Sequence, residues 1–269
     1  MMRRPGLVLL FAAAAMLFLG ACATQPGSRS AESEAQRPML DRPADSSSEE
    51  RAKVHVDLGT AYLEVGRFDV ALDEAQAALR HHADYAPAHH LRALVFMYID
   101  DEPAARENFR SALDKAPRDP DFNNSYGWFL CVTGEEREGL ERLAMASRNP
   151  YYRHPARSHT NAGLCHRRLG ELDAAREQFE RAAQQDDRNL VALFNLAEIA
   201  YEQRDYQTAR RYLVYLHQQF EPTPQSVWLG LRTERKLGNE VSEASYAAQL
   251  QGRFSDSPQY RLMTQGDFE

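Results

Sequence analysis

Cysteine and histidine are the residue types of this chain that are best suited to redox, nucleophilic or metal chemistry. The 269-residue sequence holds three cysteines and nine histidines. Two histidine pairs, His81-His82 and His89-His90, are the candidates for a metal site. Adjacent residues on a helix point to different faces, so such pairs chelate poorly compared with residues four apart. We therefore predict no metal site.

The sequence carries no motif of a cofactor-dependent or hydrolytic enzyme. It has no Gly-rich phosphate loop, no dinucleotide fingerprint and no nucleophile elbow. His166 follows Cys165, but no acidic residue that would orient the histidine is identifiable. We expect a protein that is not an enzyme, with no catalytic residues, no cofactor and no small-molecule substrate.

The N-terminus has the pattern of an export signal. Two arginines precede an unbroken apolar run at residues 7–19, which has the length of a secretory signal and is short for a membrane span. The run ends in Leu19-Gly20-Ala21-Cys22, which resembles the bacterial lipobox, where the cysteine is acylated and begins the mature chain. The alternative is an ordinary signal peptide with Cys22 as a bystander. We expect residues 1–21 to be a lipoprotein signal peptide and Cys22 to be the lipidation site, with acyl chains as the membrane anchor.

The stretch after this cysteine predicts a linker. Residues 23–50 are mostly Ser, Pro, Glu, Gln and Arg, so they bury too little apolar surface to offset the entropy of ordering. We expect lipidated Cys22 and a flexible tether over residues 22–50, with a reach of about 30 Å. Ala23, not Asp, follows the cysteine. By resemblance to Gram-negative lipoproteins, this favours the outer membrane, with the protein facing the periplasm.

The rest of the chain repeats itself at a period of about 34 residues, which is typical of tetratricopeptide repeats. The first repeat, for example, has Leu58-Gly59, Tyr62, Phe68 and Ala71 at the characteristic positions. The predicted repeats are residues 52–85, 86–119, 120–153, 156–189, 190–223 and 224–255. The fourth begins two residues late, and the sixth is degraded as a terminal capping unit would be. We expect residues 256–269 to be a C-terminal tail that forms a short helix or an extended segment against the sixth repeat.

The residue types in the pattern indicate how the helices pack. Gly or Ala at two fixed positions lets helix A and helix B of one hairpin approach closely, and aromatic residues fill the space between repeats. Gly near the end of helix A suits a left-handed cap, and Pro ends helix B. The sequence therefore predicts an all-α fold, a right-handed superhelical solenoid of about six helical hairpins, rather than an ordinary helical bundle.

Cys131 and Cys165 fall on helix A of the third and fourth repeats. These helices are neighbours in a solenoid, and thiols in the periplasm tend to be oxidised. A disulfide between them is geometrically plausible, and the alternative is two small buried apolar residues.

Stacked helix A elements line the concave side of such a solenoid. Positions that face this groove in tetratricopeptide proteins are expected to bind a partner here. The candidates are Val56, Thr60, His90, Leu94, Asn124, Trp128, Arg167, Phe194, Glu198 and Trp228. Aromatic and Arg side chains are typical interface anchors, but some of these residues are expected to pack between repeats instead. The groove lacks a continuous basic clamp, so we expect an extended segment, a helix or a strand edge as the ligand.

The charge balance excludes one class of partner. The formal net charge is −7, with Arg and Glu interspersed along the helices. Nucleic-acid binders are usually basic with a clustered patch, so no nucleic-acid partner is expected.

The whole pattern resembles the pilotins of type IV pilus biogenesis, the PilF/PilW family of outer-membrane lipoproteins with six tetratricopeptide repeats. The resemblance rests on the lipobox, the six repeats, and two segments that end in cysteine, Asn123-Asn124-Ser125-Tyr126-Gly127-Trp128-Phe129-Leu130-Cys131 and Asn161-Ala162-Gly163-Leu164-Cys165. It implies that the protein binds the pilus secretin and promotes its outer-membrane localisation and multimerisation. An envelope adaptor that scaffolds peptidoglycan hydrolases or other lipoproteins would share the fold and the anchor, and is the alternative.

Overall fold

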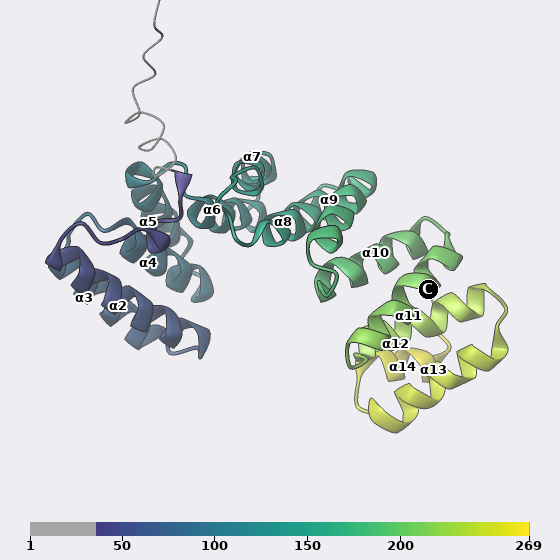
Figure 1. The fold of residues 1–269 in the computed structure, drawn as a ribbon. Coiled ribbons are helices and arrows are strands. Elements are labelled where there is room, and N and C mark those ends of the chain that lie inside the picture. Colours follow the sequence, from purple (N-terminus) through teal and green to yellow (C-terminus); the bar gives the residue numbers. More distant parts are fainter. Residues whose placement is uncertain (1–35, 269) are drawn as a thin grey trace, which may run out of the picture.

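The computed structural model describes residues 36–268, and in this range the chain is all-helical with no strand. The helices pack as antiparallel hairpins that follow one another along a curved solenoid (Figure 1). In order they are a 3-10 helix η1 (Met39–Asp41), α2 (Ser47–Glu64), α3 (Phe68–His81), α4 (Ala86–Tyr98), α5 (Glu102–Lys115), α6 (Pro120–Val132), α7 (Glu136–Ser147), α8 (Pro155–Arg168), α9 (Leu172–Gln185), α10 (Leu190–Glu202), α11 (Tyr206–Gln219), α12 (Pro224–Lys236), α13 (Glu240–Arg253) and α14 (Pro258–Gln265). The predicted signal peptide and Cys22 lie outside the described residues.

The described helices α2 to α13 form six hairpins, one for each predicted repeat. Helix A begins at the predicted residue in four repeats, at Ala86, Pro120, Leu190 and Pro224. Local chemistry fixes these starts: a polar residue caps the first turn of α6, α10 and α12, and proline stands at the start of α6 and α12, where its missing N–H costs nothing. In the fourth repeat α8 begins at Pro155, after a loop at residues 148–154 that contains the extra residues.

Close contact of the two helices explains the small residues of the pattern. In the third repeat α6 and α7 cross at Gly127 and Gly139. A Cβ on Gly127 would lie 2.8 Å from the Gly139 carbonyl oxygen, and one on Gly139 would lie 2.6 Å from Cys131 Sγ. Real Cβ atoms are not found so close to backbone, so any larger residue at either position would push the helices apart. The hairpins then bury aromatic side chains between repeats, with Phe109 and Phe129 among the fully buried ones.

The flexible tether predicted up to residue 50 is wrong for its last part. Helix α2 begins at Ser47, where Ser46 caps it by accepting a hydrogen bond from the Glu49 N–H. Ahead of this helix, Pro38 is buried, and Met39 and Leu40 pack against the cores of the second and first repeats. These few apolar residues in an otherwise polar stretch pack the segment against the solenoid.

The C-terminal tail adds a further helix to the sixth repeat. Helix α14 packs on α12 and α13, and Phe268 turns back onto Trp228 of α12 with its ring centroid 5.5 Å from that of the indole. The tail thus covers the last hairpin, whose core includes Val227, Leu231 and Leu250.

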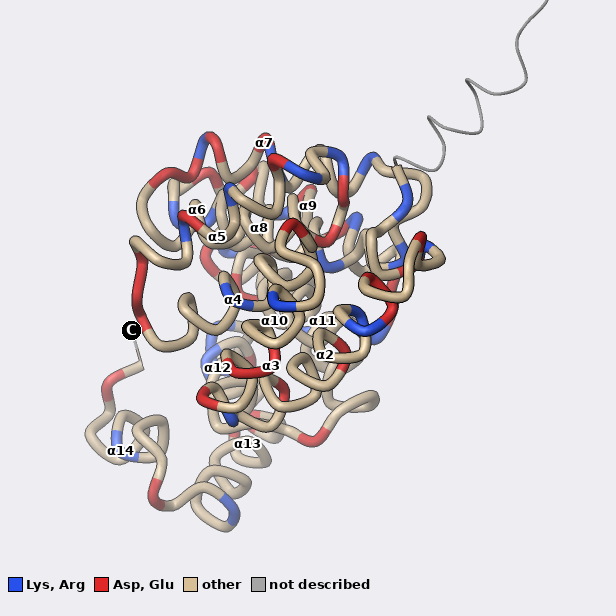
Figure 2. Tube along the Cα trace, turned by 90° about the vertical axis from the view of Figure 1, so that its left-hand side faces the viewer, with Lys and Arg blue, Asp and Glu red and all other residues tan. Residues whose placement is uncertain are grey.

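Charges of both signs are distributed over the helices rather than gathered in one region (Figure 2). Within the described range, no helix has the length and apolar character required to cross a membrane.

Candidate binding groove

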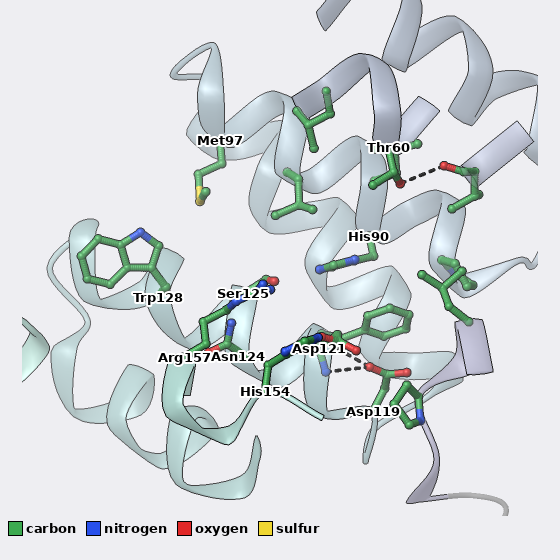
Figure 3. Close-up of a pocket in the computed structure, with 18 of the residues that line it drawn as sticks. Thr60, His90, Met97, Asp119, Asp121, Asn124, Ser125, Trp128, His154 and Arg157 are labelled. Atoms are coloured by element: carbon green, nitrogen blue, oxygen red, sulfur yellow. Dashed lines mark hydrogen bonds between the residues drawn. The ribbon is translucent and has the colours of Figure 1, made fainter. Parts of the chain in front are cut away.

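A concavity of the molecule, called here the N-terminal groove, lies along the first three repeats and reaches the start of the fourth. It is a cavity of about 620 Å³ lined by side chains of α2, α4, α6 and α8, together with residues 38–41 (Figure 3). Six of the ten predicted binding residues line it: Val56, Thr60, His90, Leu94, Asn124 and Trp128. In these repeats the predicted positions of helix A therefore face the cavity.

The wall of the groove is apolar on the side of α4. Leu94, Met97 and Tyr98 line it, and Tyr98 is 59% exposed. Trp128 lies on the adjoining repeat (Figure 3). Its side chain is half-buried against the cluster around Cys131. Val56 contributes less than expected, because it is only 2% exposed and belongs to the core of the first repeat.

Polar atoms of the groove hold neighbouring repeats together. Asn124 is buried, and its Oδ1 accepts hydrogen bonds from Ser158 Oγ at 2.9 Å and Asn161 Nδ2 at 3.2 Å. Both donors lie on α8, so this amide joins the third repeat to the fourth. The side-chain carbonyl of Asn124 is thus hydrogen-bonded within the protein. The cavity beside it is lined by the amide of Asn161 and the hydroxyl of Ser125.

His90 lies at the floor of the groove. Its ring packs 4.6 Å from that of Phe122 between centroids, and its Nε2 is shielded from solvent with no hydrogen-bond partner among the described residues. Burial lowers the pKa of the imidazole to about 3. The side chain is therefore a neutral, aromatic surface at ordinary pH rather than a charged contact.

Asp119 closes one end of the groove. It is 1% exposed and caps α6, with its Oδ1 accepting hydrogen bonds from the backbone N–H groups of Asp121 and Phe122. Its Oδ2 accepts a third from the Met39 N–H. Burial raises the pKa of this carboxyl to about 6, although the three donors act in the opposite direction. Burial also raises the pKa of Asp121, against the positive charges of Arg157 and His154.

The segment at residues 36–41 is the part of the site that sequence reasoning missed. Lys53 Nζ donates to the Leu40 carbonyl at 2.7 Å, and Asn149 Nδ2 donates to the Gln36 carbonyl at 2.8 Å. Asp41 forms an ion pair with Arg153 at 3.0 Å. The available signals were the apolar Pro38-Met39-Leu40 run inside the polar stretch and the Asp-Pro pair at the start of α6.

The other four predicted residues lie outside this groove. Arg167 of α8 bonds to Glu198 of α10 at 2.6 Å and to Glu202 at 2.9 Å, so these charges join two repeats. Phe194 is half-buried against the core of the fifth repeat. Trp228 is 6% exposed beneath Phe268.

The two cysteines of the repeats are joined in the structure. Cys131 and Cys165 form a disulfide with their Cα atoms 5.6 Å apart, and both are fully buried beside Leu143. Trp128 packs against the cluster that contains both cysteines, and the bond joins α6 to α8. Across residues 36–268, no group of three or more His, Cys, Asp or Glu side chains is placed to hold a metal ion.

Stacked helical hairpins with a concave surface lined by helix A define the class of tetratricopeptide-repeat proteins. Residues 56–120, 137–189 and 160–224 match the family model of the tetratricopeptide repeat, which together is more than half of the chain. The chain belongs to this family.

Within that class the chain is homologous to proteins of type IV pilus biogenesis. It is 28% identical over 217 residues to the type IV pilus assembly protein PilF of Pseudomonas aeruginosa, which covers 81% of this chain and 86% of that protein. The solved structure of P. aeruginosa PilF superposes with a TM-score of 0.75 at 27% identity, covering 82% of this chain and all of that one. The structure of PilW, a widely conserved type IV pilus biogenesis factor, gives 0.73 at 25% identity over 79% of this chain and 98% of that one.

Proposed function

We propose that this protein is an outer-membrane pilotin, anchored through acyl chains on Cys22, that binds a segment of the pilus secretin and promotes its localisation and multimerisation. The observation that carries the proposal is the N-terminal groove, an open cavity with an apolar wall and polar side chains opposite, in a homologue of PilF. Tetratricopeptide grooves of this kind suit an extended peptide, whose side chains meet the apolar wall while amide groups reach its backbone.

The position of residues 36–41 supports the coupling of anchor and groove. This segment leads toward Cys22 and lies at the mouth of the groove, beside Asp119. Only thirteen residues separate position 22 from position 36. Even fully extended, a chain of that length spans at most about 50 Å. An anchored Cys22 therefore keeps the groove close to the membrane and raises the effective concentration of a membrane-inserting partner.

The experiment compares a groove variant with a matched surface variant in cells that assemble the secretin. Met97→Lys places a charge on the apolar wall, whereas Val241→Lys changes a residue that is 83% exposed on α13, far along the chain from the groove. We expect Met97→Lys to reduce heat-resistant secretin multimers and co-purification of the secretin, and Val241→Lys to leave both unchanged. Equal multimers in both strains, with both proteins folded, would exclude the groove as the secretin site.

The anchor is tested separately. Cys22→Ala is expected to move the protein out of the outer-membrane fraction and to reduce secretin multimers. Multimers that persist at the wild-type level would argue against an anchored pilotin. Co-purification of peptidoglycan hydrolases or other lipoproteins in place of the secretin would favour the envelope adaptor.

A further inference from the structure

The residues after α14 place an aromatic ring on the last repeat. The helix ends at Gly266, whose φ of 73° turns the chain back. Phe268 then stacks on Trp228, with an interplanar angle of 25°, and the Arg235 guanidinium lies 3.9 Å from the centroid of the phenyl ring. Both distances lie within the range that is favourable for an aromatic pair and for a cation–π interaction.

Beside this ring lies a second cavity, called here the C-terminal cavity. It has a volume of about 380 Å³ and is lined by side chains of α10, α11 and α12 and by Phe268 itself. Tyr201, Tyr206 and Leu229 provide its apolar part. Arg232 packs over Tyr201 and Trp228, 4.8 Å and 5.7 Å from their ring centroids, and so connects the cavity to the position of Phe268.

The rim of the C-terminal cavity is positively charged. Arg204 and Lys236 line it, both exposed, and neither forms an ion pair within the described part of the chain. The carboxylates of the same cavity, Glu198 and Glu202, are already bonded to Arg167. The charge available to a ligand is therefore positive, and Asp267, the residue next to the stacked ring, has the complementary sign.

Arg204 holds its position in an unfavourable backbone conformation. It has a φ of 62° at the turn after helix A, where four other repeats have glycine, at positions 66, 134, 170 and 238. Asp100 is the corresponding exception in the second repeat, with a φ of 61°. A left-handed conformation is costly for a residue with a Cβ. At the fifth repeat the residue in this conformation is Arg204, whose cationic side chain lies at the rim of the C-terminal cavity.

We propose that the C-terminal cavity, with Trp228 and Arg235, is a second binding site, which takes a peptide segment that carries an aromatic side chain next to acidic residues. Residues 267–268 are the chain's own version of that ligand and compete with a partner for the same place. The aromatic ring of the partner stacks on Trp228, and its carboxylates face Arg204 and Lys236. The site lies on the last two repeats and does not depend on which protein the N-terminal groove binds.

The fluorescence of Trp228 provides the test. The chain has only two tryptophans, so Trp128→Phe leaves Trp228 as the single reporter. In that background Phe268→Ala uncovers the indole, and its emission is expected to shift to the red. The probe is the peptide acetyl-Gly-Asp-Phe-Glu-amide. It is expected to reverse the shift, and to bind at least about threefold more tightly to the Phe268→Ala chain than to the chain with Phe268.

Matched peptides and variants separate the contribution of the acidic residues to binding from that of the aromatic ring. Acetyl-Gly-Asn-Phe-Gln-amide tests the charge, and acetyl-Gly-Asp-Ala-Glu-amide tests the ring. Each is expected to bind at least about threefold more weakly than the probe. Arg204→Gly is expected to weaken binding by a similar factor, whereas Asp100→Gly, the same change in the same kind of turn away from the cavity, leaves it unchanged.

The same experiments can also give results that contradict the second binding site. An emission that does not respond to Phe268→Ala or to the probe, or equal affinities for the charged and neutral peptides, would overturn the proposal, with circular dichroism confirming that each variant is helical. Met97→Lys alters the N-terminal groove and leaves the C-terminal cavity intact, so it is expected to retain full binding of the probe. Failure of the secretin experiment and failure of this one are thereby distinguishable.

Discussion

The backbone N–H of Met39 donates a 2.6 Å hydrogen bond to the carboxylate of Asp119, 80 residues further along the chain. The same carboxylate caps α6 through the N–H groups of Asp121 and Phe122. One buried side chain therefore starts a helix of the third repeat and holds the segment that precedes the first repeat. This arrangement brings the chain that leads to Cys22 to the mouth of the N-terminal groove.

Asp119→Asn is expected to change how stability depends on pH. Burial raises the pKa of Asp119 in the folded protein from 3.8 to about 6, so the folded state binds the proton more tightly than the unfolded state does. The stabilisation that results from this tighter proton binding is fully present below pH 3.8 and is lost as the pH rises through about 6. At 1.36 kcal/mol per pKa unit, the difference in unfolding free energy between variant and wild type should move by about 2–3 kcal/mol in favour of the variant between pH 4 and pH 7.5.

Urea unfolding at the two pH values measures that change. The comparison of variant with wild type removes the contribution of Asp121, which has the same sign. Amide exchange of Met39 provides an independent reading, because the amide side chain of the variant lacks one acceptor oxygen and should let this N–H exchange faster. A difference that does not vary with pH would show that Asp119 is not the titrating group.

His90→Phe is expected to change the pH dependence of stability in the opposite direction, because the variant gains over wild type as the pH falls. Burial lowers the pKa of His90 from 6.5 to about 3, so its stability contribution is present above pH 6.5 and is lost as the pH falls toward 3. A phenyl ring keeps the packing on Phe122 without binding a proton. The variant should therefore gain about 1–3 kcal/mol over wild type between pH 7.5 and pH 4.5. Thermal unfolding across this range measures it, and parallel pH curves for the two proteins would contradict the prediction.

The starts of all hairpins but the first could be predicted from the sequence to within a residue or two because their signals are local. Gly127 and Gly139 are needed where two helices touch, and Pro120 stands where a helix starts, so the residue type itself marks the place. The face of helix A that lines the N-terminal groove follows from the same periodicity. Helix α2 was predicted to begin too late because its first turn, from Ser47, is polar and carries no such mark.

What the sequence could not indicate are the contacts between segments far apart in the chain. Neither Met39 nor Phe268 carries a local signal for its partner, because Asp119 and Trp228 lie far away in the sequence and come near only in the folded chain. Trp228 was expected to be available to a partner, and the tail covers it. Arg167 was expected to contact a ligand, and it is bonded to the next helix A.

Loss of the Cys131–Cys165 disulfide is expected to weaken the solenoid at its centre. The bond closes a loop with a sequence separation of 34 residues. Closing a loop of that size raises the free energy of the unfolded chain by about 3–4 kcal/mol, because the chain loses conformational entropy. Wild-type protein should lose about this much unfolding free energy when a reductant is added, and Cys131→Ala/Cys165→Ala should start low and not respond to reductant. A wild-type curve that is insensitive to reductant, with two thiols titrated in the denatured protein, would show that the bond is absent.

Arg204→Gly and Asp100→Gly are expected to stabilise the protein by unequal amounts. Both residues have a φ near 60°, and glycine removes the clash of the Cβ, which costs about 1–2 kcal/mol in the left-handed region. Part of this gain is offset because glycine is freer in the unfolded chain, by roughly 0.5–1 kcal/mol. Aspartate tolerates the left-handed region better than arginine does. Arg204→Gly should therefore gain about 0.5–1 kcal/mol, and Asp100→Gly about half of that or less.

Chemical denaturation of both variants measures these gains, with Gly134→Ala as the reverse change at a φ of 93°. That variant should lose about 1 kcal/mol or more, because alanine enters a conformation that only glycine adopts freely. If Arg204→Gly is more stable and also binds the acidic peptide more weakly, the arginine is retained at a cost to the fold for the sake of the charged rim. A less stable Arg204→Gly would instead mean that the side chain supports the fifth repeat, and the strain at this turn would then say nothing about binding.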